Sequence, residues 1–148
     1  MIIFVLRHAD RSATLPDGLS PAGVARARFL AHMLSESGVS IAYCSDALRT
    51  QETLVPLKEI LGDALTIRVV SAAGPGGLEA HVEAIIAGLK ELPNSAVAVV
   101  VSHSNTVGPI IEGLGGNGIP PVAENEFDKL FVLFGPANSL KTLLHLRY

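Results

Sequence analysis

The chain has 148 residues, of which 49% are hydrophobic and 17% are charged. This length is enough for one well-buried core and too short for two ordinary domains, so we expect a single domain over residues 1–148. Eleven basic against fourteen acidic residues give a net charge of −3, which supplies no broad positive field for nucleic acid or an anionic membrane. Any site for an anion must therefore be local.

The single cysteine and the short apolar N-terminal run limit the setting of the protein. Cys44 alone excludes an internal disulfide and a cysteine-based zinc cluster. The apolar run Ile2–Leu6 meets Arg7 after five residues, which is too short for the apolar region of a signal peptide or for a membrane span. We expect a cytoplasmic protein, and a leader removed from before Met1 stays an open alternative.

The first half of the chain predicts strands and helices in alternation. Ile2–Leu6 is a continuous β-branched and aromatic run, typical of a strand that is covered on both faces. Ser20 followed by Pro21 predicts the start of an amphipathic helix that closes near Gly38. A short strand is expected over Val39–Cys44, and after it a helix capped by Ser45, stopped by Gly62 and carrying Arg49 on its first turn.

The second half continues the alternation. Leu65–Val70 is predicted as a strand, Ala73–Gly77 as a loop and Leu78–Leu92 as a helix. Ala96–Val101 is a second uninterrupted apolar run and hence a second central strand, followed by a helix near Thr106–Leu114.

The last third predicts a flexible connection over Gly115–Pro121 and then two strands. These are expected at Lys129–Phe134 and Leu140–Leu146, joined through Gly135, Pro136, Ala137 and Asn138 as an antiparallel hairpin. The whole pattern predicts an α/β fold, a three-layer α/β/α sandwich with a mainly parallel central sheet and an antiparallel edge strand.

Histidines follow both predicted central strands directly. Arg7 and His8 end the first of them, and His103 follows the second. Ligands of such sheets bind outside the carboxyl ends of the strands, so the two histidines are expected to face one crevice, which Arg49 joins from the end of a third strand.

Two histidines and two arginines around one crevice suit phosphoryl transfer. Guanidinium forks bind phosphate oxygens bidentately, and flanking arginines favour the uncharged form of a histidine, which is the form that attacks as a nucleophile. Arginines also neutralise the transferring group without a metal ion, so we expect no cofactor.

Four segments in order resemble the motifs of the histidine phosphatase (phosphoglycerate mutase-like) superfamily. Leu6-Arg7-His8-Ala9-Asp10 resembles its Arg-His-Gly signature, and Leu19-Ser20-Pro21-Ala22-Gly23 resembles its Leu-Thr-x-x-Gly helix start. Residues 45–53 are similar to its Ser-x-x-x-Arg-x-x-x-Thr segment, and Ser102-His103-Ser104-Asn105 is similar to its second-histidine motif. The shortness of the chain resembles that of the phosphohistidine-phosphatase-like members.

The resemblance implies a role for each matching residue. His8 is implied as the nucleophile that becomes phosphorylated, Arg7 and Arg49 as phosphate clamps, and His103 as a donor to the phosphoryl oxygens. Arg11 stands where one branch of the family has a further arginine and is an additional candidate ligand. The sequence departs from the family motifs at two positions. Ala9 replaces the glycine after the nucleophile, and Ser104 replaces the glycine or aspartate that often follows the second histidine. Neither change removes a reacting group.

The general acid is the open position, because the aspartate of a His-Asp pair is missing at Ser104. Glu79 lies at the start of a predicted helix, in the interval where the mutase-like branch supplies a glutamate. Asp10, next to the nucleophile, is the alternative. We favour Glu79, although acidic residues also favour a helix start through the helix dipole alone.

These observations lead to a metal-independent phosphatase acting on a phosphomonoester or on phosphohistidine, with His8 as the phosphorylated intermediate. The expected partners are a phosphorylated small molecule or a phosphoprotein, with no nucleic acid and no membrane. The alternatives are a catalytically inactive phosphate- or partner-binding module, a phosphoglycerate mutase-like phosphotransferase and a dinucleotide-binding protein. A zinc or iron site built from His8, Asp10 and His103 is disfavoured because the arginines would repel a cation.

Overall fold

The computed structural model describes residues 1–136, 139–140 and 142–148 of the chain, and a single six-stranded sheet runs through its middle. The strands lie in the order β3-β2-β4-β1-β5-β6. In chain order their bounds are β1 Ile2–Arg7, β2 Ile41–Cys44, β3 Thr66–Val69, β4 Val97–Ser102, β5 Lys129–Phe134 and β6 Thr142–Arg147.

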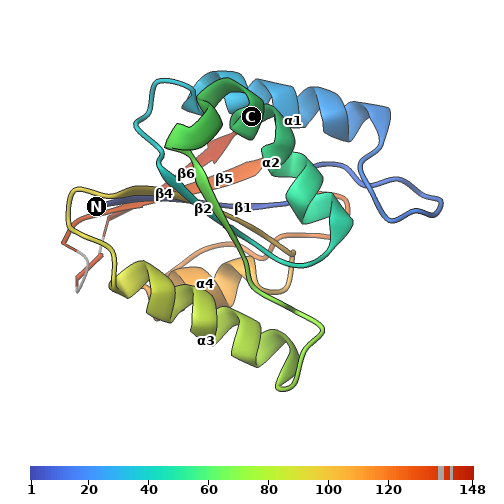
Figure 1. Cartoon of the computed structure of the whole chain (residues 1–148). Helices are drawn as coiled ribbons and strands as arrows, with labels where there is room; N and C mark the ends of the chain where they lie inside the picture. Colours follow the sequence, from blue (N-terminus) through green and yellow to red (C-terminus); the bar gives the residue numbers. More distant parts are fainter. Residues whose placement is uncertain (137–138, 141) are drawn as a thin grey trace.

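Four α-helices cover the two faces of this sheet (Figure 1). Helices α1 (Pro21–Leu34) and α2 (Leu48–Leu61) pack together on one face, and a 3₁₀ turn, Gly62–Ala64, follows α2. Helices α3 (Gly77–Lys90) and α4 (Val107–Gly113) cover the other face. The predicted three-layer sandwich is confirmed.

The register of the sheet brings the ends of its two central strands together. Strands β1 and β4 are parallel neighbours, and Arg7 pairs with Ser102 at their carboxyl ends. Strand β2 is parallel to β4 on its other side. The C-terminal strands β5 and β6 add to β1 through antiparallel pairings, as the predicted hairpin requires. The carboxyl ends of β2, β4 and β1 therefore meet along one edge of the sheet.

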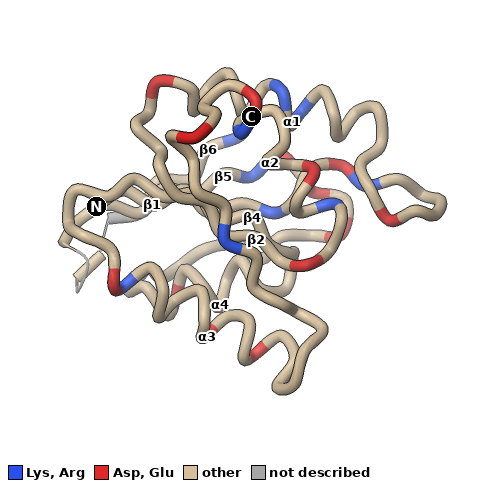
Figure 2. The backbone as a smooth tube through the Cα atoms, viewed as in Figure 1, with Lys and Arg blue, Asp and Glu red and all other residues tan. Residues whose placement is uncertain are grey.

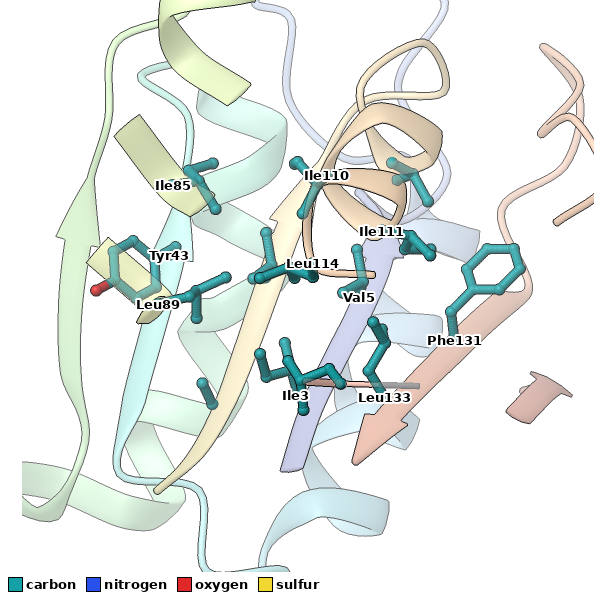
Figure 3. Packing of buried hydrophobic residues seen from close by; sticks show 14 of the residues in the cluster. Ile3, Val5, Tyr43, Ile85, Leu89, Ile110, Ile111, Leu114, Phe131 and Leu133 are labelled. Atoms are coloured by element: carbon teal, nitrogen blue, oxygen red, sulfur yellow. The ribbon is translucent and has the colours of Figure 1, made fainter. Parts of the chain in front are cut away.

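Alternating side chains of the central strands supply both halves of the core. Ile3 and Val5 of β1 face α3 and α4, where they pack in the cluster that Figure 3 shows with Ile110 and Leu133. Leu6 faces the opposite way and packs in the cluster under α1 and α2. Strands that are apolar on both faces in this way are typical of a sheet covered by two helix layers, which explains why β1 and β4 read as uninterrupted apolar runs.

Helix α1 starts as the sequence predicts. The hydroxyl of Ser20 accepts a hydrogen bond from the backbone N–H of Gly23 at 3.1 Å, and Pro21 occupies the first helical position. A Cβ atom at Gly23 would lie 2.0 Å from the backbone oxygen of Asp10, so only glycine permits this approach. Helix α1 is thereby packed directly against the segment that follows His8.

Several predicted boundaries differ from the structure. Helix α1 ends at Leu34, and a separate turn carries the chain to Gly38, whose positive φ of +79° suits glycine. Helix α2 begins at Leu48 with Ala47 in the capping position, so the predicted cap at Ser45 is wrong. The Ser45 hydroxyl instead accepts a hydrogen bond from the N–H of Ala47 and reaches into the site described below.

Two further expectations concern the end of the chain and the membrane. Ala137 and Asn138, in the predicted hairpin turn, lie outside the described residues. Within the described part of the chain, none of the helices combines the length and the apolar character that crossing a membrane requires.

Candidate active site

The two histidines that follow β1 and β4 lie side by side at the edge of the sheet. The backbone N–H of His8 continues the ladder between the strands by donating to the carbonyl oxygen of Ser102 at 2.9 Å. The centroids of the His8 and His103 rings are 5.7 Å apart. The parallel pairing of β1 and β4 thus brings both imidazoles together, as expected for two histidines that each follow a central strand.

The imidazole of His8 is held in one orientation and uncharged. Its Nδ1 lies 2.8 Å from the carbonyl oxygen of Ala9, an arrangement in which Nδ1 carries the proton and donates it. The Nε of Arg49 donates to Nε2 of His8 at 3.1 Å, so Nε2 presents a lone pair. Burial, followed by the charges of Arg7 and Arg49, lowers the pKa of His8 to about 3. At neutral pH, Nε2 is therefore unprotonated and carries the lone pair that a nucleophile needs, with the Arg49 N–H bonded to it.

Arg7 is fixed by backbone oxygens of a distant loop. Its Nη1 donates to the carbonyl oxygens of Ala123, Glu124 and Glu126 at 3.0, 2.8 and 3.1 Å. The guanidinium also lies over the ring of Phe127, 4.1 Å from its centroid. Arg7 is buried, and that burial lowers its pKa from the usual value, without removing its charge at neutral pH. The loop over residues 123–127 thus holds a guanidinium rigidly beside the nucleophile.

Arg49 reaches the site from the first turn of α2 and touches both histidines. Besides its bond to His8, its Nη2 lies 3.4 Å from Nδ1 of His103. Its Nη1 forms an ion pair with Asp17, which belongs to the loop between β1 and α1. The guanidinium fork is therefore aimed at the space between the two rings and steadied from outside by Asp17.

A buried pair of hydroxyl groups supports His103 from behind. Its Nε2 lies 2.9 Å from the hydroxyl of Ser45, which in turn lies 2.9 Å from the hydroxyl of Thr50. The Thr50 hydroxyl is 2.8 Å from the carbonyl oxygen of Ala47, to which it donates. Burial and then the charge of Arg49 lower the pKa of His103 to about 4, so this ring is also uncharged at neutral pH.

A third buried histidine, His81, connects the ends of two strands under the site. Nδ1 of His81, on α3, lies 2.9 Å from the carbonyl oxygen of Val70, and its Nε2 lies 3.0 Å from the hydroxyl of Ser102. The Ser102 hydroxyl is 2.7 Å from that of Thr106, which accepts from the N–H of His103 at 3.0 Å. His81 is thus a structural histidine with both ring nitrogens bonded, and it connects α3 to the backbone of His103.

The segment after the nucleophile is anchored by Thr53. Its hydroxyl accepts from the backbone N–H of Ala9 at 3.0 Å and donates to the carbonyl oxygen of Arg49 at 2.8 Å. The same hydroxyl therefore ties the nucleophile segment to the helix that carries the clamp Arg49. The motif that spans residues 45–53 supplies three different supports: Ser45 for His103, Arg49 for the pocket and Thr53 for Ala9.

These groups line an open pocket of about 570 Å³. Of the residues predicted to bind phosphate, Arg7, Arg11, Arg49 and His103 all line it, together with His8. The segments around Asp46, Ala72 and Leu78 also line the pocket, as does Glu124. The structure therefore gathers the five predicted residues at one site, and sequence reasoning missed Ser45, Thr53 and Glu124, of which only Ser45 and Thr53 lie in a recognisable motif.

The two carboxyl groups weighed as the general acid lie elsewhere. Glu79 is exposed on the first turn of α3. Its neighbour Leu78 lines the pocket, but Glu79 is not among the lining residues. Asp10 is bound by Nε of Arg26 at 2.6 Å, which directs it towards α1. Within the described residues, no three histidine, cysteine, aspartate or glutamate side chains are grouped closely enough to hold a metal ion.

Comparisons with known proteins agree with this geometry. Residues 3–72, which include the nucleophile and the Arg49 segment, match the family model of the histidine phosphatase superfamily (branch 1). Over these residues, just under half of its length, the chain is similar to the histidine phosphatase superfamily. Members of this superfamily are phosphatases and mutases. A search of the curated proteins finds no match.

Solved structures of two phosphatases share the fold over nearly the whole chain. The protein histidine phosphatase SixA complexed with tungstate is 23% identical, with a TM-score of 0.73 over 99% of this chain and 97% of that chain. A mycobacterial glucosyl-3-phosphoglycerate phosphatase is 16% identical, with a TM-score of 0.69 over 99% of this chain and 97% of that chain. At these identities the likeness shows the fold, and it extends over the second half of the chain, beyond the residues that match the family model.

Proposed function

We propose that this protein is a metal-independent phosphatase that transfers the phosphoryl group of a phosphomonoester or of phosphohistidine to His8 and then hydrolyses it. The observation that carries the proposal is the lone pair of His8 Nε2, uncharged at neutral pH and surrounded by two guanidinium groups and a second imidazole. The arrangement matches what phosphoryl transfer requires, namely a positioned nucleophile and positive charge around the equatorial oxygens.

The first step forms a bond between Nε2 of His8 and phosphorus while the bond from phosphorus to the leaving oxygen or nitrogen breaks. The electron pair of that bond goes to the leaving atom, and Arg7 and Arg49 hold the phosphoryl oxygens. His8 keeps its proton on Nδ1, bonded to the carbonyl oxygen of Ala9, and becomes a positively charged phosphoimidazole. Water then attacks phosphorus, and inorganic phosphate leaves with Nε2 unprotonated again.

The leaving group decides how much acid assistance the reaction needs. An alkoxide must gain a proton as it leaves, whereas a phenolate or a ring nitrogen of imidazole leaves more easily. Glu79 remains our proposed proton donor for alkyl esters. The alternative, a module that binds phosphate without turnover, is favoured by the exposed position of Glu79 outside the pocket walls.

The test is a trapped phosphoenzyme. The protein is mixed with an aryl phosphate in the presence of a chelator, quenched and mapped by mass spectrometry. We expect phosphate on His8, and we expect the His8→Asn variant to lose both the label and at least about a thousandfold in turnover. The exposed His32 gives a matched control, because His32→Asn removes a histidine of α1 without touching the site. Hydrolysis that survives His8→Asn would overturn the proposal, and tight phosphate binding without any phosphoenzyme would support the inactive module.

A further inference from the structure

Glu124 places a carboxylate at the mouth of the pocket. The residue lies in the irregular segment before β5, and its side chain is 86% exposed while it lines the pocket. Its exposure means that it adds charge to the rim without the cost of burying that charge.

The backbone of Glu124 is fixed to the catalytic centre. Its carbonyl oxygen accepts from Nη1 of Arg7 at 2.8 Å, between the similar bonds from Arg7 to Ala123 and Glu126. The carboxylate lies 3.7 Å from Nη2 of Arg7, and it accepts from the hydroxyl of Ser104 at 3.3 Å. Ser104 directly follows His103. The Glu124 carboxylate, on a backbone anchored by Arg7, therefore lies near both Arg7 and His103, the two groups expected to bind phosphate.

The net charge of the pocket lining determines how the Glu124 carboxylate affects a bound substrate. Three arginines line the pocket, Arg7, Arg11 and Arg49, and two carboxylates, Asp46 and Glu124. With both histidines uncharged at neutral pH, the lining carries one net positive charge. A bound phosphate dianion reverses this charge, and the proton that the dianion favours on His103 restores neutrality, so that Glu124 supplies the local negative charge at the rim. A second anionic group on the substrate is then repelled, and a cationic group is attracted. Figure 2 shows both acidic and basic positions along the backbone near α2.

The two carboxylates of the lining do different things. Asp46 accepts from the hydroxyl of Ser71 at 2.6 Å and from the N–H of Ala72 at 3.0 Å, and these bonds lower its pKa. Its oxygens therefore hold the loop after β3 in place. Among the described residues, the Glu124 carboxylate accepts from the Ser104 hydroxyl at 3.3 Å and lies 3.7 Å from Nη2 of Arg7, and both contacts are longer than those of Asp46. Glu124 is the carboxylate that remains for the substrate.

We propose that Glu124 is a specificity-determining residue, which favours substrates that carry a positive charge near the leaving atom and disfavours substrates with a second anionic group. This inference rests on the proposed function, because it names the chemistry of the leaving group at the same site. Ala72, Ala73 and Leu78 also line the pocket and offer uncharged side chains to the apolar body of such a group.

The test uses three phenyl phosphates that differ only in the group at the para position: aminoethyl, ethyl and carboxyethyl. Their scissile bonds are nearly equal in reactivity, so their relative kcat/KM values report the distal charge. We expect the cationic probe to exceed the neutral one by about fivefold and the anionic one to fall below it by a similar factor, the size expected of one exposed ion pair. The differences should shrink at high ionic strength.

Glu124→Gln should bring the three values to within about twofold of one another, and the ratio, not the absolute rate, is the readout. The exposed Glu59 of α2 provides a control with the same change in net charge, and Glu59→Gln should retain the native ratios. A native protein without the expected order, or an order that survives Glu124→Gln, would overturn the inference. So would an equal loss in both variants, which would indicate an effect of net charge alone.

Binding separates this inference from the proposed function. Calorimetric titration of His8→Asn with the same three probes should give dissociation constants in the same order, with the order lost when Glu124→Gln is added. If the native protein hydrolyses none of the probes but keeps this order, the proposed function fails and the role of Glu124 stands. If it hydrolyses all three equally and binds them equally, the role of Glu124 fails and the proposed function stands.

Discussion

Nε2 of His103 lies 2.9 Å from the hydroxyl of Ser45, and both groups are buried. The Ser45 hydroxyl accepts the Nε2 proton when its own proton is donated to Thr50, and Nδ1 of His103 then faces Arg49 and the pocket. A phosphate dianion at that place favours a proton on Nδ1, so His103 becomes a charged donor only with its far nitrogen bonded to Ser45. The serine that the sequence suggested as a helix cap is a support for the second histidine.

Removing this hydroxyl should impair catalysis more than substrate binding. For Ser45→Ala we expect kcat to fall about tenfold, the value of about one buried hydrogen bond to a charged group. The pH above which activity declines should also fall, because His103 loses the acceptor that supports its charged form. Steady-state kinetics on an aryl phosphate across pH would check both. An unchanged pH profile with a uniformly lower rate would show that Ser45 matters only for packing.

The free energy of unfolding should decrease as the pH falls below about 6.5, the pKa of histidine in the unfolded chain. The pKa values of about 3 for His8 and about 4 for His103 lie below the unfolded value of about 6.5, so the unfolded chain binds more protons between these limits. Each histidine then contributes a loss of up to about 1.4 kcal/mol per pH unit in the free energy of unfolding.

Urea unfolding between about pH 7 and pH 4 measures this slope. In His103→Gln the slope should be shallower than in the native protein, whatever the change in absolute stability. His32→Gln should keep the native slope, because His32 is exposed. Equal slopes in all three proteins would contradict the assignment of buried, uncharged histidines.

Thr53 should matter for the nucleophile although it does not line the pocket. Thr53→Val keeps the shape of the side chain but leaves the N–H of Ala9 without its 3.0 Å acceptor, at a cost of about 1 to 3 kcal/mol in the free energy of unfolding. The rate should fall as well, because Ala9 follows His8 and its carbonyl orients the ring. Urea titrations and kcat measurements are the checks. Thr66→Val, at an exposed position, should change neither by a comparable amount.

Gly23 should tolerate no side chain. A Cβ atom there would lie 2.0 Å from the backbone oxygen of Asp10, so Gly23→Ala forces α1 away from the nucleophile segment, at about 2 to 3 kcal/mol. Gly108 of α4 offers a matched control, because its Cβ would lie 3.5 Å from the Ile119 side chain. Gly108→Ala should be neutral or stabilise the protein by about 0.5 to 1 kcal/mol through helix propensity. Thermal unfolding that ranks the two variants in the opposite order would refute this view of the α1 contact.

The positions of the histidines followed from the sequence because local patterns determine them. The apolar runs of β1 and β4 indicate strands covered on both faces, and parallel neighbours bring their carboxyl ends together, so His8 and His103 meet without any knowledge of the loops. Arg49 was predicted on the same grounds, since it lies in the first turn of the helix after β2.

The contacts that hold the site residues in place could not be predicted from local sequence patterns, because they are tertiary contacts. Arg7 is held by carbonyl oxygens of residues 123–126, and a backbone acceptor leaves no mark in the side-chain sequence. Glu124 lies in an irregular segment more than a hundred residues from Arg7, where no periodicity predicts which way the chain turns. The role of Glu79 stays a prediction: the residue is exposed on the first turn of α3, and its neighbour Leu78 lines the pocket.

The pairing of Arg7 with Ser102 has a consequence for how the activity can be lost. Both histidines follow directly on a hydrogen-bonded ladder between the two innermost strands, and the amide of His8 is itself part of that ladder. Their relative placement therefore has the full cooperative stability of the sheet, since such central strands open only when the molecule unfolds globally. Mild denaturant that melts surface loops should leave the two rings aligned, and the site should disappear in the same transition as the fold.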